Sequence, residues 1–262
     1  MPLLSPDYIL AAFLILVRVS SFMMIAPFFS ATVFPTRIKI LFALMTSIFL
    51  YPVIPAQHVM MDAGSGFVVV FFAIIQEVLT GVALGLVGQL VFAGLELAGS
   101  LISIQTALRF ANVVDSMTDQ QSAIISTLFN LLAVLFFLGI NGDKMYIMAL
   151  AYSFEHIPVG MATLNMASPL LVELSVQIFI TGVQIASPFL LVLFLLNLSF
   201  AIFARIMPQA NIFFIALPLK LAVGLILMIM VLPYLPIAFD IMFQGMFEAL
   251  SQLIDLLMPD AM

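Results

Sequence analysis

Few side chains in this sequence have the type and spacing needed for catalysis or metal binding. It has two histidines, His58 and His156, and no cysteine among its 262 residues. The carboxylates nearest to them in sequence, Asp62 and Glu155, do not form a spaced motif such as HExxH, and neither a P-loop nor a G-x-S-x-G motif is present. The sequence therefore predicts no catalytic residue, no metal site and no cofactor, and we expect the protein not to be an enzyme.

Charged residues inside apolar stretches are the more informative polar groups. Arg18 and Glu77 lie within long apolar runs, where a lipid-facing charge costs about 2.5–3.5 kcal/mol or more. Each is therefore expected to face protein or water. Together with Arg205 and Lys220 they are candidates for ion pairs between subunits. For each of them, a pair within the chain or a position at the membrane interface is the alternative.

The elements that must position these residues are apolar helices. The chain is 65% hydrophobic and 8% charged, with a mean hydropathy of +1.31, whereas soluble domains carry roughly 25% charged residues. This composition predicts an all-α integral membrane protein with about six hydropathy spans and no separate soluble domain. The sequence lacks the basic patch of nucleic-acid-binding proteins, so no nucleic-acid partner is expected.

Prolines divide the apolar runs in the second half of the chain. Pro188 is expected to kink or break its helix, because proline cannot donate a backbone hydrogen bond. Pro218 lies inside the last long apolar run. Pro233 and Pro236 are expected to break the chain before an amphipathic closing helix at residues 238–258.

Three glycines, Gly81, Gly85 and Gly88, are spaced at i, i+4 and i+7 in a long apolar run. This spacing places them on one helical face and allows another helix to approach closely. That second helix is expected either in a partner subunit or in the same chain.

The longest polar interruption covers residues 99–122. Non-helical backbone is tolerated at membrane depth only inside protein or beside water. We therefore interpret this segment as a loop that faces an aqueous path and is held by the surrounding helices. A solvated loop that joins two spans is the alternative.

Residues 204–220 resemble a signature of the FliR family of flagellar export-gate proteins, to which the SctT proteins of virulence secretion systems are related. Matching patches occur in order along nearly the whole chain. They are Arg18-Val19, Pro27-Phe28-Phe29-Ser30, Pro35, Arg37, residues 105–115, Asn141-Gly142, Ser153-Phe154, Pro158-Val159-Gly160, Ala204-Arg205, Pro208-Gln209, Asn211, Phe213 and Pro218-Leu219-Lys220. The sequence departs from the family pattern at Ala210, Ala216, Thr106-Ala107, Ser116 and Asp143.

The resemblance implies a single FliR-like domain over residues 1–262, with helical hairpins interrupted by Pro and Gly. Residues 1–203 are expected to be similar to FliP, and residues 204–262 to the helical pair of FliQ. Partners are expected to be FliP and FliQ in a hetero-oligomeric export gate, then FlhB, FlhA and the exported flagellar proteins. The expected location is the flagellar basal body in the bacterial inner membrane.

The resemblance also assigns roles to individual residues. The loop is expected to plug the pore, with apolar side chains bracketed by Arg109 and Asp115. The candidate plug residues are Gln105, Leu108, Arg109, Phe110, Ala111, Asn112, Val113, Val114 and Asp115. The candidates for packing between subunits are Arg18, Glu77, Gly81, Gly85, Gly88, Arg205, Pro208, Gln209, Asn211, Pro218 and Lys220. A tight turn between helices is the alternative role for residues 208–211.

Two other functions remain open at this stage. A virulence type III export gate would differ in the exported substrate. A small-solute secondary transporter would fit the predicted broken helices and intramembrane charges, although the two halves of the sequence do not form a convincing internal repeat.

Overall fold

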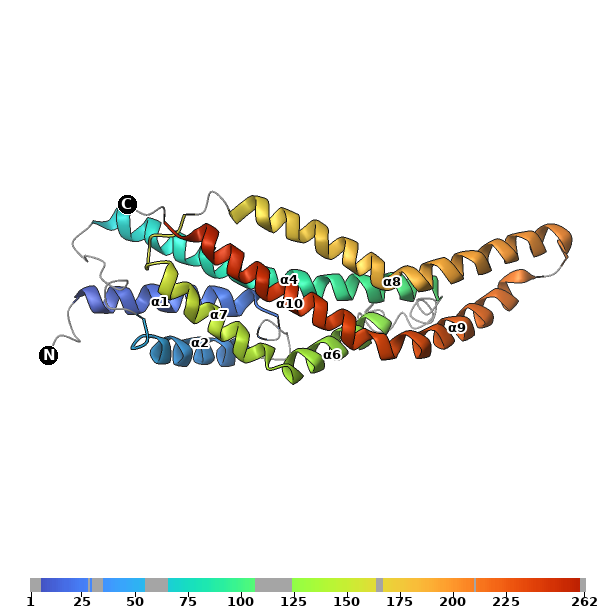
Figure 1. Ribbon diagram of the computed structural model, residues 1–262, viewed down its shortest axis with the longest axis horizontal. Coiled ribbons are helices and arrows are strands. Elements are labelled where there is room, and N and C mark those ends of the chain that lie inside the picture. Colours follow the sequence, from blue (N-terminus) through green and yellow to red (C-terminus); the bar gives the residue numbers. More distant parts are fainter. Residues whose placement is uncertain are drawn as a thin grey trace. The chain divides into compact units, whose positions relative to one another are not determined.

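The computed structural model describes residues 6–27, 29, 35–54, 66–106, 124–163, 167–209 and 211–259. In this part of the chain the regular elements are all helices (Figure 1), which confirms the all-α class. The elements are α1 (Pro6–Ile25), α2 (Thr36–Leu50), α4 (Phe67–Gln105), α6 (Ile124–Gly139), α7 (Gly142–His156), α8 (Ala167–Ile206), α9 (Ile212–Val231), the 3₁₀ helix η2 (Leu232–Tyr234) and α10 (Leu235–Leu257).

Within the described residues, four helical stretches are long and apolar enough to cross a membrane, and the broken pair α6–α7 adds a fifth if it counts as one span. The four stretches are Pro6–Ile25, Phe67–Gln105, Ser168–Ile206 and Ile212–Leu257. The sequence predicts about six spans. The number is lower because α2 has only 15 residues and α6 only 16. The helices are those of a membrane protein.

The sequence predicts a kink or a break at Pro188, and the helix is not broken there, because α8 continues through the proline. A proline nitrogen cannot donate to the carbonyl four residues earlier, which here belongs to Gln184. The Ser187 hydroxyl donates to that oxygen at 2.7 Å and so replaces the missing donor. Helix α9 likewise runs through Pro218.

The prolines after α9 also interrupt the chain less than expected. Pro233 lies in η2, a three-residue 3₁₀ turn, and α10 begins directly afterwards at Leu235. Pro236 is therefore in the first turn of α10, where a proline needs no backbone donor. The predicted break is a local tightening of the helix.

The helices form two compact units built from discontinuous segments. Unit 1 comprises Met1–Val91, Ile140–Ser175 and Phe243–Met262, and unit 2 comprises Phe92–Gly139 and Val176–Met242. This division interleaves along the chain. The expected FliP-like part (1–203) and FliQ-like part (204–262) concern likeness to other proteins and stay a prediction.

In unit 1, α1 supplies the central apolar stripe. Its buried residues are Ala11, Leu14, Ile15, Arg18, Val19, Phe22 and Met23. Their spacing of three and four residues is that of one helical face. Helix α2 packs against α1 and buries a narrow face of Ala43, Ser47 and Leu50.

The glycine stripe of α4 lies against α1 of the same chain. A Cβ atom added at Gly81 would overlap the Arg18 carbonyl oxygen, and one at Gly85 would lie 3.1 Å from the Phe22 carbonyl oxygen. A Cβ at Gly88 would meet the Tyr146 hydroxyl and the ring of Pro27. Of the two interpretations of the stripe, the structure therefore supports packing within the chain for these faces.

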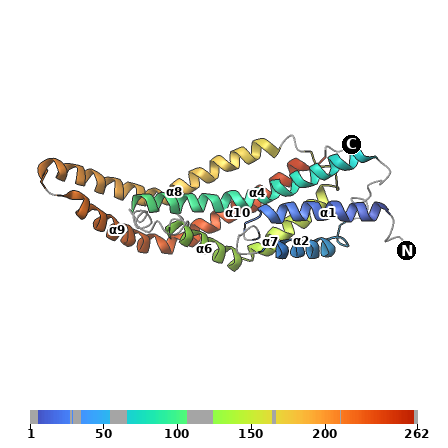
Figure 2. The same cartoon turned by 180° about the vertical axis from the view of Figure 1, so that it is seen from behind.

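Unit 2 also depends on close helix approaches at small residues. A Cβ at Gly182 of α8 would lie 2.7 Å from the carbonyl oxygen of Gly94 on α4, and one at Gly99 would lie 2.6 Å from the Ser126 Cα atom on α6. Helices α8 and α9 form an antiparallel hairpin that both ribbon views show (Figures 1 and 2). Gly224, the buried residue of α9, lies against Thr106 at the end of α4.

We expect Gly81→Ala to destabilise the protein by about 1–3 kcal/mol, the usual cost of overpacking a filled core. The new methyl group would collide with the backbone of α1, which cannot rotate away as a side chain can. The measurement is the thermal unfolding midpoint in detergent. Gly245→Ala on α10 is the matched control, because nothing lies within 4 Å of its Cβ position. Equal midpoints for the two variants would contradict the tight packing.

Candidate functional site

Arg18 on α1 and Glu77 on α4 form a salt bridge in the core of unit 1. The Arg18 Nε atom donates to Glu77 Oε2 at 2.6 Å, and its Nη2 atom donates to Oε1 at 2.9 Å. Both side chains are 0% exposed. The pairing is bidentate, which is the strongest arrangement of a guanidinium with a carboxylate.

The remaining donors of Arg18 reach the end of α7. Its Nη1 atom donates to the Ser153 carbonyl oxygen and to the Ile157 carbonyl oxygen, each at 3.3 Å. The Arg18 Cζ atom also lies 4.2 Å from the centroid of the Phe154 ring, within the range of a cation–π interaction. Among the described residues, no buried side-chain nitrogen or oxygen is left without a hydrogen-bond partner.

Glu77 receives a further hydrogen bond from the chain that follows α7. The backbone N–H of Gly160 donates to Glu77 Oε1 at 2.7 Å. Gly160 has φ +77°, a left-handed conformation that glycine adopts without a steric penalty. The glycine thus turns the backbone so that its N–H points at the carboxylate.

Residues 157–163, which we call the clasp segment, connect the ion pair to α10. In addition to the bonds from Arg18 and to Glu77, the Ala162 carbonyl oxygen accepts from Gln76 Nε2 at 3.4 Å. Thr163 donates its backbone N–H to the Leu257 carbonyl oxygen at 3.1 Å, and its hydroxyl donates to the Met258 carbonyl oxygen. The clasp segment therefore supplies partners to carbonyls at the C-terminal end of α10, which no intrahelical donor reaches.

Tyr146 of α7 adds a second polar contact with α4. Its hydroxyl donates to the Leu84 carbonyl oxygen at 2.8 Å and accepts from the Gly88 N–H at 3.2 Å. These two backbone groups would bond to each other in a regular α-helix. The hydroxyl therefore lies at that position of the ladder, and the missing side chain of Gly88 gives it the space.

The predicted site residues fall into separate groups. Arg18 and Glu77 come together as a pair within the chain, and their complete burial argues against a contact with another subunit. Gly81 and Gly85 lie where α4 crosses α1, and Gly88 lies next to them against Tyr146 and Pro27. Arg205, Pro208, Gln209, Asn211 and Pro218 are exposed, and Lys220 is half-buried. For these six, packing against other subunits stays a prediction.

Residues 207–211 join α8 to α9. The Met207 N–H donates to the Phe203 carbonyl oxygen at 2.8 Å, and the Phe214 N–H donates to that of Asn211 at 3.2 Å. Pro208 and Gln209 form the turn itself. This geometry supports the turn-forming role.

Of the predicted plug residues, Gln105 is the last residue of α4 and is half-buried. The other plug residues, 108–115, lie outside the described residues. Within the described residues, no group of three or more metal-ligating side chains is present.

Sequence reasoning missed the roles of Tyr146, Gly160 and Thr163. Gly160 carries a usable signal, because it follows Pro158-Val159 directly after a helix, where a left-handed turn is common. Tyr146 and Thr163 carry none, since their partners are backbone atoms 58 and 94 residues away.

The sequence matches the family model described as "Bacterial export proteins, family 1" over residues 9–246. The chain belongs to this family. Among its curated relatives, the flagellar biosynthetic protein FliR of Escherichia coli (strain K12) is 33% identical and covers 91% of this chain and 90% of its own. FliR of Aquifex aeolicus (strain VF5) is 31% identical, with coverage of 95% and 96%. FliR of Bacillus subtilis (strain 168) is 30% identical, with coverage of 85% and 86%.

These matches confirm the FliR family identified from the sequence patches. Family membership makes the chain a component of the flagellar export apparatus with a structural role, not an enzyme. The ion pair and the clasp segment are accordingly parts of the scaffold of a FliR-family protein.

We expect Glu77→Gln to cost about 3–5 kcal/mol of stability, because it leaves the buried Arg18 cation without a counter-charge. The double variant Arg18→Met/Glu77→Leu should recover part of this loss, since it removes both charges. The measurements are the level of the protein in membranes and its unfolding midpoint in detergent. Glu96→Gln is the control, because Glu96 lies on the same helix but is exposed. A Glu77→Gln variant as stable as this control would contradict the assignment.

Proposed function

We propose that the chain is the FliR-type subunit of a flagellar type III export gate in the bacterial inner membrane. With FliP and FliQ it forms the pore through which unfolded flagellar proteins leave the cell. FlhB, FlhA and the exported proteins are its further partners in the basal body. The family match supports the export role, and the length of the exposed apolar surface supports the assembly with other subunits.

The apolar length of α8 is the observation that carries this proposal. Exposed large apolar side chains occur from Val172 to Ile206 along the helix. At about 1.5 Å per residue these 34 steps correspond to roughly 51 Å along the helix axis. The hydrocarbon core of a bilayer is about 30 Å thick. Even at a tilt of about 40°, the upper end of the usual range, the stretch would cover roughly 39 Å along the membrane normal.

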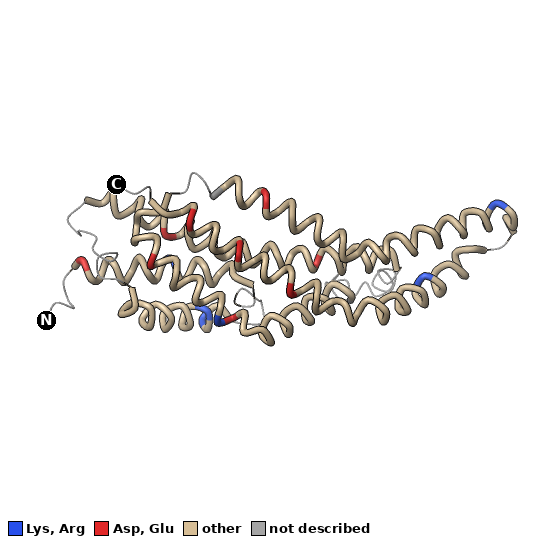
Figure 3. Tube along the Cα trace, viewed as in Figure 1, with Lys and Arg blue, Asp and Glu red and all other residues tan. Residues whose placement is uncertain are grey.

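Lipid alone therefore cannot cover all of this apolar surface, and other protein chains are the natural cover. The following helical stretch, Ile212–Leu257, is longer still at 46 residues, and its exposed large apolar side chains run from Phe213 to beyond Ile241. Figure 3 shows how sparsely charges occur along the α8–α9 hairpin, where Arg205 and Lys220 are the described cations. Partner subunits would cover the apolar surface, and carboxylates on those subunits would pair with Arg205 and Lys220.

The plug role of residues 105–115 rests on the resemblance and on how the loop begins. Thr106 is 1% exposed and lies against Gly224 of α9. Its hydroxyl also donates to the Ile102 carbonyl oxygen at 2.9 Å. Thr106, at the start of the loop, is thus packed against α9 at the end of α4, as a segment that holds a fixed position in a pore requires.

The features that would fit a small-solute transporter have another explanation. Helices α8 and α9 run through Pro188 and Pro218, and Arg18 and Glu77 neutralise each other. A transporter would need broken helices and charges that remain available to substrate. The export gate is therefore the function that we propose.

Purification of the tagged chain, coexpressed with FliP and FliQ of the same organism, tests the assembly. We expect both partners to copurify in fixed molar ratios, because only protein can cover the apolar length beyond the bilayer. The measurement is quantitative mass spectrometry combined with particle mass in detergent. A stable solitary monomer would contradict the proposal.

Removal of residues 108–115 tests the plug. We expect the complex with this deletion to leak small ions across the membrane, because the pore would lose its occluding segment. Ion flux is measured in cells or in proteoliposomes. A deletion of similar length at residues 57–64, also outside the described helices, is the control. Unchanged conductance with an intact complex would exclude the plug role.

A further inference from the structure

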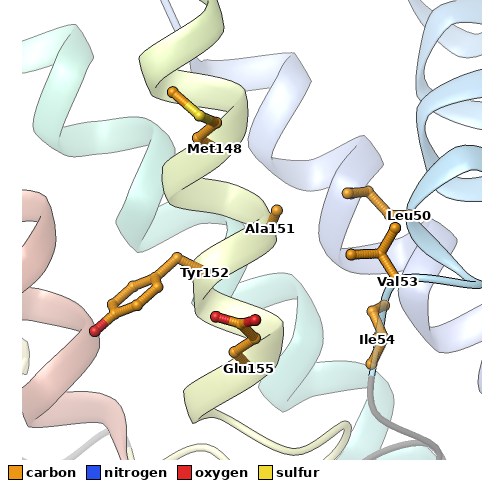
Figure 4. Close-up of a pocket in the computed structure, with 7 residues that line it drawn as sticks. All are labelled: Leu50, Val53, Ile54, Met148, Ala151, Tyr152 and Glu155. Carbon is orange, nitrogen blue, oxygen red and sulfur yellow. The ribbon is translucent and has the colours of Figure 1, made fainter.

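A small pocket in unit 1 lies between α2 with the turn that follows it and the exposed side of α7. Its lining residues, shown in Figure 4, are Leu50, Val53, Ile54, Met148, Ala151, Tyr152 and Glu155. We call it the α2–α7 pocket. It shares no residue with the Arg18–Glu77 site or with the clasp segment.

The pocket has the size of one side chain. Its volume is about 170 Å³, and an apolar protein cavity of about 150 Å³ holds a benzene molecule. Leu50, Val53 and Ile54 form one apolar wall, and Met148 and Ala151 form the other. The pocket thus accepts a flexible apolar stem but not a whole helix.

Glu155 places a negative charge on the rim of this apolar space. Its side chain is exposed and forms no hydrogen bond or ion pair with any residue in the described ranges. Tyr152 beside it lines the pocket, and its ring contacts that of His156 in a tilted arrangement, with ring centroids 3.9 Å apart. The rim therefore offers a carboxylate, which attracts cations.

We propose that the α2–α7 pocket receives a lysine or arginine side chain from a partner subunit of the export gate. The methylene stem packs between Leu50, Val53 and Met148, and the charged group reaches Glu155. Lysine and arginine commonly bury their stems in this way while the charge stays at a polar site. The proposal rests on the proposed function, because it requires another subunit to cover α7.

The charge of the chain supports a cation from outside. The sequence has 13 acidic and 7 basic residues. On α7 the basic residue Lys144 already donates to the Asn141 side chain at 2.9 Å. A partner that covered Glu155 without a cation would bury an unpaired carboxylate, which is strongly unfavourable. Specific assembly therefore requires a positive group at this position.

A protein cation fits better than the amine of a lipid. In phosphatidylethanolamine a phosphate lies close to the amine, so its negative charge would approach Glu155 as well. The acyl chains of a lipid are also far longer than the pocket. A lysine or arginine side chain has one apolar stem, one charge and no neighbouring anion.

Site-specific photo-cross-linking in the assembled complex tests the occupant directly. A photoreactive phenylalanine analogue replaces Met148, and the cross-linked peptides from intact membranes are identified by mass spectrometry. We expect a peptide of FliP, FliQ or another export-gate subunit, with a lysine or arginine at or next to the cross-linked residue. Cross-links only to residues 55–65 of the same chain, only to lipid, or to nothing would overturn the proposal.

Charge reversal tests the role of Glu155. We expect Glu155→Lys to lower the amount of copurified partner per tagged chain by about tenfold, because two facing cations repel each other across an interface. Glu155→Gln should lower the amount of copurified partner less. Ala151→Leu should also lower it, because the larger side chain fills the pocket. Glu173→Lys on α8 is the matched control, since Glu173 is also exposed and makes no described pair.

The wild-type complex separates the two hypotheses. If the wild-type chain recovers no partner subunit, the proposed function fails. If it recovers its partners and Glu155→Lys recovers them equally well, only the pocket proposal fails. Reversal of the cross-linked partner's cation to glutamate should restore assembly of Glu155→Lys, and an absent rescue would count against the pair.

Discussion

A buried charge is tolerated only when a counter-charge and hydrogen bonds replace the water it has lost. Arg18 and Glu77 meet this requirement with groups from three places: each other, the end of α7 and the backbone of Gly160. A guanidinium is planar and directs its N–H groups in fixed directions. The acceptors on α4 and at the end of α7 must therefore lie at matching positions around Arg18 of α1. The close approach of α1 to Gly81 and Gly85 follows from the same arrangement, since the ion pair and the glycines belong to one helix crossing. The ion pair thus joins α1 and α4 to the end of α7 and to the segment that follows it.

Much of this organisation could be predicted from the sequence, because composition and spacing act locally. The apolar runs predicted the helices, the spacing of Gly81, Gly85 and Gly88 predicted a close helix approach, and the position of Arg18 in an apolar run required a partner. The choice between a partner in the chain and one in another subunit could not be made. Arg18 and Glu77 are 59 residues apart, and the helix periodicity of each segment does not reveal which helices meet.

The errors in the predicted interruptions have a common physical cause. A break was one of the two outcomes expected at Pro188, but a single hydroxyl, that of Ser187, satisfies the carbonyl that the proline leaves without a donor, and the helix continues. One 3₁₀ turn likewise carries the chain past Pro233. Hydropathy also marks which residues avoid water but not whether lipid or protein replaces it. The exposed apolar side of α8 is longer than a bilayer is thick, which is why we propose that other protein chains cover part of it.

The interleaving of the two units constrains how the chain is made. Unit 1 needs residues 243–259, which the ribosome produces only after all of residues 176–242 of unit 2. Until then Thr163 has no α10 carbonyl to bind, and the apolar side chains that α10 covers in the finished protein remain exposed. A nascent chain therefore cannot complete its first unit before all of its second has been synthesised. Partial products consequently differ from the finished protein in the surface that they offer to insertion factors and membrane proteases.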